Sequence, residues 1–162
     1  MQFELLTRIE PEQAKFYLTE NKGIYFWFTK DTDTLVYIGV ALGAGGLKKR
    51  LISQHLNEKY LEYRSTKHTE KDKFQLQYAY KKKSKDGKTI QLGIDKSSFR
   101  KSIGRKLKLK PGSDTVQYIL CNLYIRIFES EDISKLRELE VTLIKRYSPQ
   151  FNTSHNTTLK IQ

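Results

Sequence analysis

The sequence is poor in cysteine and has no long apolar run, and these shortages exclude several classes of protein. Its single cysteine, Cys121, has no second thiol with which to form an internal disulfide or a thiolate metal site. No stretch approaches the ~18 apolar residues that a membrane span requires. The opening residues MQFELLTRIEPEQ lack the basic and apolar regions of a secretory signal. We therefore expect a soluble, cytoplasmic protein with no membrane partner, and its oligomeric state stays open.

Acidic residues are scarce relative to basic ones, and the imbalance is concentrated in the middle of the chain. The 162 residues carry a formal net charge of +12. Residues 48–110 contain 20 lysines and arginines against 6 acidic residues, whereas the rest of the chain contains 10 against 12. A one-sided basic field is typical of a protein that binds nucleic acid, because neutralising phosphates releases counterions. The alternative is that the lysine-rich loops only make the protein soluble.

The first third of the chain predicts two helices on either side of a β-hairpin. Pro11 opens a short helix, since proline is tolerated in the first helical turn. Aromatic and β-branched residues at 23–28 and 34–40 flank a polar turn, which indicates the hairpin. Three glycines within residues 41–46 predict a loop, and a helix over 47–60 follows it.

The middle of the chain predicts a second, strongly basic hairpin and a cationic helix. An Asp-Gly pair at 86–87 favours a tight turn between strands at 74–80 and 89–94. Serine at position 97 or 98 is suited to cap a short helix over 97–107.

The end of the chain predicts a long strand and an amphipathic helix with a carboxylate on its apolar side. We expect the strand at 115–128 and the helix at about 132–147. At 100° per residue Glu140 falls inside the apolar arc of this helix, whereas Glu138 points to the opposite side. Burying an unpaired carboxylate costs several kcal/mol. Glu140 should therefore pair with a cation, bind a metal or lie at the edge of a cleft.

Two tripeptides of the first hairpin carry a resemblance to a known family. Gly23-Ile24-Tyr25 and Tyr37-Ile38-Gly39 resemble the motif of the GIY-YIG nuclease superfamily, which includes homing endonucleases, the incision subunit of nucleotide excision repair and several restriction endonucleases. The segment Leu47-Lys48-Lys49-Arg50 is similar to the helix on which the family carries an arginine.

The end of the chain extends the resemblance. Glu140, followed by Leu143-Ile144 and, after a proline, by Asn152, is similar to the glutamate helix and the asparagine of the family. Residues 97–104 are similar to a basic helix found in one bacterial branch. Residues 60–96 match no part of the family pattern.

The resemblance implies a role in phosphodiester hydrolysis for each matching side chain. Glu140 is implied to hold one Mg²⁺, with Mn²⁺ as an alternative, and Arg50 to contact a phosphate oxygen. Tyr25 and Tyr37 are implied to orient the attacking water, with one of them as the base. Because the usual pKa of tyrosine is about 10, a base role requires nearby positive charge. Asn152 is implied to tie the chain after the helix to the catalytic loop by hydrogen bonds, which is a positioning role.

The sequence departs from the family pattern at two positions that often help the base. Many members carry a lysine just after the second tripeptide or a histidine one helical turn after the arginine, where this chain has Val40 and Gln54. His55 is the nearest histidine and a candidate for that catalytic role. It points about 140° away from Arg50 on an ideal helix, so it reaches the site only if the helix is irregular. A surface or packing histidine is the alternative.

We interpret residues 1–162 as a single α/β (α+β) domain, a small mixed β-sheet flanked by helices, in which a GIY-YIG-type nuclease core carries a basic hairpin and helix insertion at about 60–110. The predicted function is Mg²⁺-dependent endonucleolytic hydrolysis of DNA. A non-catalytic nucleic-acid-binding module and an RNA-directed nuclease are the alternatives, because phosphates are common to both polymers. Sequence specificity and biological role stay open. The side chains expected to contact nucleic acid are Lys48, Lys49, Lys81, Lys82, Lys83, Arg100, Lys101 and Arg105.

Overall fold

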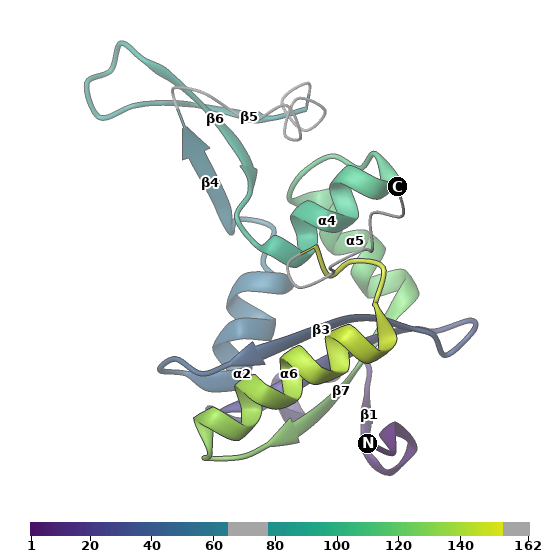
Figure 1. The fold of residues 1–162 in the computed structure, drawn as a ribbon. Helices are drawn as coiled ribbons and strands as arrows, with labels where there is room; N and C mark the ends of the chain where they lie inside the picture. The colour runs from purple at the N-terminus through teal and green to yellow at the C-terminus, as the bar shows by residue number, and fades with distance from the viewer. Residues whose placement is uncertain (65–77, 154–162) are drawn as a thin grey trace, which may run out of the picture. The chain divides into compact units, whose positions relative to one another are not determined.

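The structure is a computed structural model that describes residues 1–64 and 78–153, and the chain divides into two compact units (Figure 1). The first unit comprises Met1–Ile52 and Asn122–Gln162, and the second comprises Ser53–Cys121. Each contains helices and an antiparallel sheet, so the predicted α+β class is confirmed. The prediction of a single domain with an insertion at about 60–110 is not tested by this division into units. No helix among the described residues is long and apolar enough to cross a lipid bilayer.

The first unit is built on a four-stranded sheet with the strand order β1-β7-β2-β3. Its pairings are all antiparallel, rather than the predicted mixture of parallel and antiparallel pairs. The strands are β1 (Arg8–Ile9), β2 (Gly23–Thr29), β3 (Leu35–Ala41) and β7 (Leu123–Glu129). Three short helical segments precede β2: η1 (Phe3–Leu5), η2 (Pro11–Gln13) and α1 (Ala14–Tyr17). The segments η2 and α1 together correspond to the predicted first helix.

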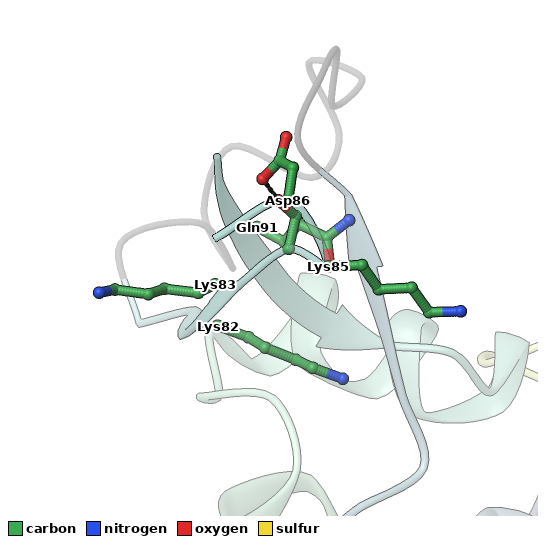
Figure 2. Close-up of a pocket in the computed structure, with 6 residues that line it drawn as sticks. Lys82, Lys83, Lys85, Asp86 and Gln91 are labelled. Carbon is green, nitrogen blue, oxygen red and sulfur yellow. Dashed lines mark hydrogen bonds between the residues drawn. The ribbon is translucent and has the colours of Figure 1, made fainter. Parts of the chain in front are cut away.

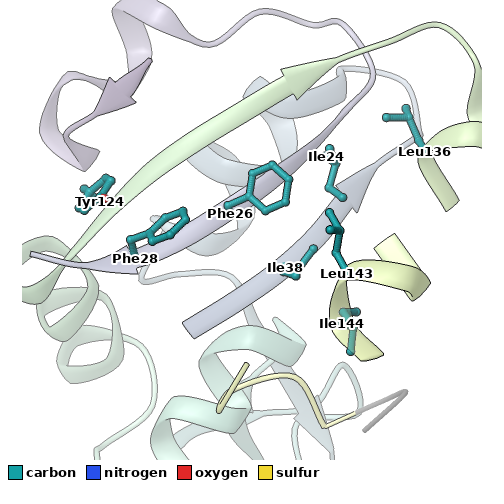
Figure 3. Close-up of a cluster of buried hydrophobic side chains, with 8 residues drawn as sticks. All are labelled: Ile24, Phe26, Phe28, Ile38, Tyr124, Leu136, Leu143 and Ile144. Atoms are coloured by element: carbon teal, nitrogen blue, oxygen red, sulfur yellow. The ribbon is translucent and has the colours of Figure 1, made fainter. Parts of the chain in front are cut away.

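The core of the first unit lies between this sheet and helix α6 (Ile133–Tyr147). Side chains alternate along a strand, so every second residue of β2 projects toward the helix. Burying one such aliphatic or aromatic side chain stabilises the fold by about 1.5–3 kcal/mol, which holds α6 against the hairpin. The cluster in Figure 3 consists of Ile24, Phe26, Phe28, Ile38, Tyr124, Leu136, Leu143 and Ile144.

Helix α6 confirms the predicted final helix, and local chemistry sets its ends. The side chain of Asp132 accepts a hydrogen bond of 2.9 Å from the Lys135 N–H, which satisfies one of the free donors of the first turn. Ser148 ends the helix in the left-handed region, with φ of 44°.

The predicted strand over 115–128 is wrong in its first half. Helix α5 (Ser113–Asn122) occupies that part, and β7 begins only at Leu123. The buried residues of α5 include Val116 and Ile119, which are three apart and share one side of a helix. The alternating apolar run fitted both periods, so the sequence pattern alone did not separate the helix from the strand. Cys121 consequently lies on a helix, where it is exposed.

The helix predicted over 47–60 is shorter and more irregular than expected. It begins as α2 (Gly46–Lys48) and continues as the π-helical segment η3 (Lys49–His55). The loop before it is anchored because the Leu47 and Lys48 N–H groups donate to the carbonyl oxygens of Asn21 and Thr19, at 3.0 and 2.8 Å. These bonds satisfy donors that the start of a helix otherwise leaves free.

The second unit holds a three-stranded antiparallel sheet with the order β4-β6-β5. The helix α4 (Ser98–Leu107) and the strand β6 (Ile90–Asp95) confirm two predicted elements. The first strand of the hairpin, β5 (Tyr80–Lys83), lies closer to the Asp-Gly turn than the predicted 74–80, and residues 78 and 79 are outside any strand. Residues 74–77 of the predicted strand lie outside the described residues. The additional strand β4 (Leu61–Arg64) was not predicted.

Arg100 is the structural centre of the second unit, which corrects its predicted role in nucleic-acid binding. Its side chain is fully buried and pairs with the equally buried Asp95, at 2.7 Å from Nη2 to Oδ1. Asp95 also accepts hydrogen bonds from the Gly112 N–H and the Thr115 hydroxyl, at 2.9 and 3.0 Å. A guanidinium enclosed in this way cannot reach a phosphate. Its remaining donors bind the carbonyl oxygens of Gln54, Asn57 and Tyr60.

We predict that Arg100→Met strongly destabilises the second unit. The substitution leaves the Asp95 carboxylate buried without its cation, which costs about 3–5 kcal/mol of the free energy of unfolding. Urea unfolding measures the loss. Lys106→Met removes an exposed cation from the same helix and should stay within about 0.5 kcal/mol of the parent. Equal stability of the two variants would contradict the structural role of the ion pair.

Candidate active site

The two tyrosines of the hairpin lie on the face of the sheet opposite the hydrophobic cluster. Tyr25 is the cross-strand partner of Gly39, and Tyr37 is the partner of Trp27. Cross-strand partners share a face, so Tyr25 and Tyr37 are diagonal neighbours on it. Their ring centroids are 6.2 Å apart with an interplanar angle of 30°. The predicted pairing of two tyrosines from adjacent strands is therefore present.

Each outer glycine of the two tripeptides makes room for a larger side chain on this face. A Cβ atom at Gly39 would lie 2.4 Å from the hydroxyl oxygen of Tyr25. One at Gly23 would lie 2.8 Å from a methyl carbon of Leu47, the buried residue of α2. Contacts this short do not occur between real side chains. The glycines thus allow Tyr25 to lean across β3 and α2 to dock on the tyrosine face.

Arg50 and Glu140 come from distant parts of the chain and act electrostatically on both tyrosines. Arg50 lies on η3 and Glu140 on α6, and both are half-buried. The positive charge of Arg50 lowers the pKa of each tyrosine, and the negative charge of Glu140 raises it. A Coulomb interaction weakens with distance but acts without direct contact. The first unit therefore couples four of the predicted catalytic side chains electrostatically, namely two tyrosines and two opposite charges.

The hydroxyls of the tyrosines have different acidities because of burial and of the hydrogen bond between them. Burial is the largest cause that raises the pKa of Tyr25 well above its usual range, and burial also raises the pKa of Tyr37 to about 12. The hydrogen bond raises the pKa of Tyr25 and lowers that of Tyr37, as expected when Tyr25 donates and Tyr37 accepts. Tyr37 is consequently the easier of the two to ionise.

Asn152 fixes the edge strand next to Tyr37 rather than a catalytic loop. Its Oδ1 accepts from the Ile38 N–H at 2.9 Å, and its Nδ2 donates to the Ile38 carbonyl oxygen at 2.8 Å. The Phe151 N–H adds a bond of 3.0 Å to the carbonyl oxygen of Val36. Since β3 is an edge strand, this side chain replaces a neighbouring strand at one position. Asn152 is therefore a positioning residue.

The donor set around Glu140 fits a hard divalent cation held by few protein ligands. The described residues contain no cluster of three or more His, Cys, Asp or Glu side chains that could enclose a metal. Mg²⁺ keeps several waters and is usually bound through one or two carboxylates together with substrate phosphates. A single half-buried carboxylate that is electrostatically coupled to two phenols is compatible with this mode. Glu140 is the residue that would hold the ion.

His55 lies in the second unit, where its contacts are those of a packing residue. Its side chain is buried, and its Nδ1 lies 2.8 Å from the Ser97 hydroxyl oxygen. The ring also packs edge-on against Phe99, with centroids 5.4 Å apart. The π-helical winding of η3 supplies the predicted irregularity. The contacts of the ring nevertheless favour the packing alternative, and we leave His55 out of the catalytic set.

The basic residues predicted to contact nucleic acid differ in how freely they are presented. Lys48 and Lys49 are exposed on the first unit, as are the three lysines of β5, Lys81–Lys83, on the second. Lys101 pairs with Glu62 at 3.1 Å, and Arg105 is half-buried. Exposed lysines are thus available on both units, whereas part of the positive charge of helix α4 is paired or half-buried.

The sequence analysis missed Gln91, which lies beside these lysines. It lines an open hollow of about 510 Å³ at the end of the β5–β6 hairpin (Figure 2). In the hairpin register Gln91 is the cross-strand partner of Lys82. The position of Gln91 relative to the Asp-Gly turn is the sequence signal that predicts its pairing with a lysine of the opposite strand. The hollow is lined by Lys82, Lys83, Ser84, Lys85, Asp86 and Gln91.

No protein-family model, curated protein or solved structure matches the chain. The resemblance to the GIY-YIG superfamily thus rests on the residues of the sequence itself.

We predict that Tyr37→Phe reduces the loss of stability at alkaline pH. The folded pKa of Tyr37 is about 12, above the value of about 10 in an unfolded chain. Between these values the unfolded state has lost the proton and the folded state keeps it, so stability falls as pH rises. Urea unfolding below pH 10 and near pH 11 should show a smaller fall for the variant.

The control for this measurement is Tyr17→Phe, which removes the hydroxyl of a tyrosine that is 54% exposed. It should lose stability with pH as the parent does. An identical fall for Tyr37→Phe and the parent would contradict a raised pKa at Tyr37.

Proposed function

We propose that the protein is a metal-dependent endonuclease that hydrolyses DNA phosphodiester bonds at the tyrosine face of its first unit. The observation that carries the proposal is the electrostatic coupling of the two hydrogen-bonded tyrosines of that face to Arg50 and Glu140. Phosphodiester hydrolysis requires an activated water, a charge that stabilises the pentavalent phosphate and a stabilised leaving oxygen. The four side chains supply groups of the required types.

We assign the base role to Tyr37 and a supporting role to Tyr25. Tyr37 has the lower pKa of the pair, and it accepts the hydrogen bond from Tyr25. A phenolate that receives a hydrogen bond is stabilised relative to the phenol, so the Tyr25 hydroxyl favours proton loss from Tyr37. The half-buried Tyr37 is also the more accessible to a water molecule, because Tyr25 is only 2% exposed.

Arg50 and Glu140 supply the charges that the reaction requires. The planar guanidinium of Arg50 can donate two hydrogen bonds to phosphate oxygens, and its permanent charge favours the phenolate of Tyr37. The carboxylate of Glu140 opposes this effect while it is uncompensated. A Mg²⁺ bound at Glu140 would cancel that opposition and stabilise the leaving oxygen. Asn152 keeps Tyr37 in place through the backbone of Ile38.

We predict that Glu140→Gln abolishes cleavage while folding persists. The substitution keeps the shape of the side chain and removes the charge that would hold the metal, so the rate should fall by at least about a hundredfold. Cleavage of labelled duplex DNA with Mg²⁺ measures the loss. Glu138→Gln, an exposed position on the same helix, is the matched control and should cleave at the parent rate.

Full activity of Glu140→Gln would overturn the assignment of the site. A parent protein that binds DNA without cleaving it would favour the non-catalytic module, and preferential cleavage of labelled RNA would favour the RNA-directed nuclease.

A further prediction separates the two tyrosines by their effects on the pH profile. Tyr37→Phe removes the base and should lower the cleavage rate by about 10²–10⁴-fold. Tyr25→Phe removes only the hydrogen bond to Tyr37, which raises the pKa of Tyr37. The rising limb of the rate profile should then move to higher pH, with a smaller loss of maximal rate. The reverse pattern would identify Tyr25 as the base, and normal cleavage by both variants would show that the rings only pack.

A further inference from the structure

We propose that the β5–β6 hairpin reads base edges in the major groove of duplex DNA with one face and holds phosphates with the other. The hairpin belongs to the second unit, and residues 81–91 contain five lysines and one aspartate. The inference rests on the proposed nuclease function and deepens it, because it names duplex DNA as the substrate and identifies side chains that select its sequence.

The antiparallel register divides the polar side chains of the hairpin between two faces. Lys82 and Gln91 are cross-strand partners, so they share a face, and Lys81 and Lys83 project to the other. Figure 2 shows Lys82 and Lys85 extending to the same side and Lys83 extending away from them. We call Lys82, Lys85 and Gln91 the reading face, and Lys81 and Lys83 the phosphate face.

The reading face is held in place by an aromatic ring of the neighbouring strand. Tyr63 of β4 lies over Gly93, where a Cβ atom would stand only 2.6 Å from the ring. The Lys82 Nζ lies 5.1 Å from the centroid of the same ring, within the range of a cation–π interaction. A lysine restrained in this way loses less side-chain freedom when it binds.

The carboxylate of Asp86 stabilises the turn at the end of the hairpin by hydrogen bonds within the turn. Asp86 accepts hydrogen bonds from the Ser84 hydroxyl and from the backbone N–H groups of Lys88 and Thr89, the latter two at 2.9 and 3.0 Å. These bonds hold the pKa of Asp86 well below its usual range. Gly87 completes the turn with φ of 70°. The acidic residue therefore organises the turn, and the lysines around it face outward.

The groups on the reading face match base edges in the major groove. A glutamine amide can pair with N6 and N7 of adenine, and a lysine ammonium can donate to O6 and N7 of guanine. The side chain of Gln91 is half-buried at the hollow, and no hydrogen bond joins this side chain to any residue that the structure describes. Its amide is thus available to a ligand at a defined place between two lysines.

The shape of the hairpin favours duplex DNA over duplex RNA. Two strands spaced about 4.8 Å apart form a ribbon that the major groove of B-DNA, about 12 Å wide, admits. The major groove of A-form RNA is deep and narrow, and side chains cannot read it. The described residues of β4 pair with β6 up to Leu92, and from Ile90 to Leu92 β6 pairs with β5, so these two strands form a ribbon within the described part of the chain.

Selection from random duplexes tests the reading face. The Glu140→Gln protein is used in EDTA, with a library of duplexes about 20 base pairs long that have a randomised centre. We expect an enriched motif that contains an adenine, and Gln91→Ala on this background should lower discrimination at that position by about five- to 150-fold. Gln91→Glu should move the preference there toward cytosine, because a carboxylate accepts from its N4 amino group.

The phosphate face is tested by affinity across a salt series on the enriched duplex. Lys83→Ala should weaken binding to every sequence equally and reduce the slope of log affinity against log salt by about 0.9. Lys15→Ala removes an exposed lysine of the first unit and serves as the charge-matched control, with an unchanged slope. Duplex RNA of the enriched sequence should compete poorly. Thermal melting confirms that each variant is folded.

The outcomes separate the failure of this inference from the failure of the proposed function. An unchanged motif in both Gln91 variants, or an unchanged salt slope in Lys83→Ala, would overturn the hairpin as the DNA reader while cleavage by the parent still supported the nuclease. Equal competition by duplex RNA would overturn the major-groove geometry. If the parent neither binds nor cleaves duplex DNA, both proposals fail.

Discussion

The pairing of Tyr25 with Gly39 across β2 and β3 is the constraint on which the candidate site depends. Because Gly39 has no side chain, the ring of Tyr25 leans over the edge strand and its hydroxyl meets Tyr37. The same register buries Ile24, Phe26 and Ile38 on the opposite face. A slip of one residue would exchange the two faces of the hairpin and expose this cluster. Burial of the core therefore stabilises the register that also places the two tyrosines side by side.

Helix α6 connects the core with the electrostatics of the site. Its apolar residues Leu136, Leu143 and Ile144 dock against the sheet, and Glu140 comes from the same helix. The chain after the helix then binds the edge strand through Asn152, next to Tyr37. One segment thus supplies the negative charge and restrains the strand that carries Tyr37. The positive charge of Arg50 acts against that carboxylate, so the acidity of Tyr37 depends on how the carboxylate is compensated.

The second unit divides its positive charge between the interior and the surface. The side chain of Arg100 binds Asp95 and backbone carbonyl groups inside the unit, and Lys101 pairs with Glu62. The lysines of β5 are exposed, and Lys82 rests on the ring of Tyr63. The net charge of the middle segment therefore overstates the number of cations that can meet a polyanion. The arrangement on the hairpin is therefore the basis of the proposed DNA contact.

The sequence by itself determined the elements whose signals are local. The hairpin of the two tripeptides, the Asp-Gly turn and the apolar arc around Glu140 all depend on neighbours within a few residues. The same holds for the α+β class, which follows from the alternation of such elements.

The tertiary structure alone decided the features that depend on distant partners. Period-2 and helical patterns overlap in residues 115–122, and packing of Val116 and Ile119 selected the helix. The sequence predicted Arg100 as a surface cation, whereas in the structure Asp95 and three carbonyl groups enclose its side chain. His55 was a candidate for the catalytic role in the sequence, whereas in the structure its ring contacts the Ser97 hydroxyl. Each case depends on burial and on contacts between elements, which composition and spacing do not record.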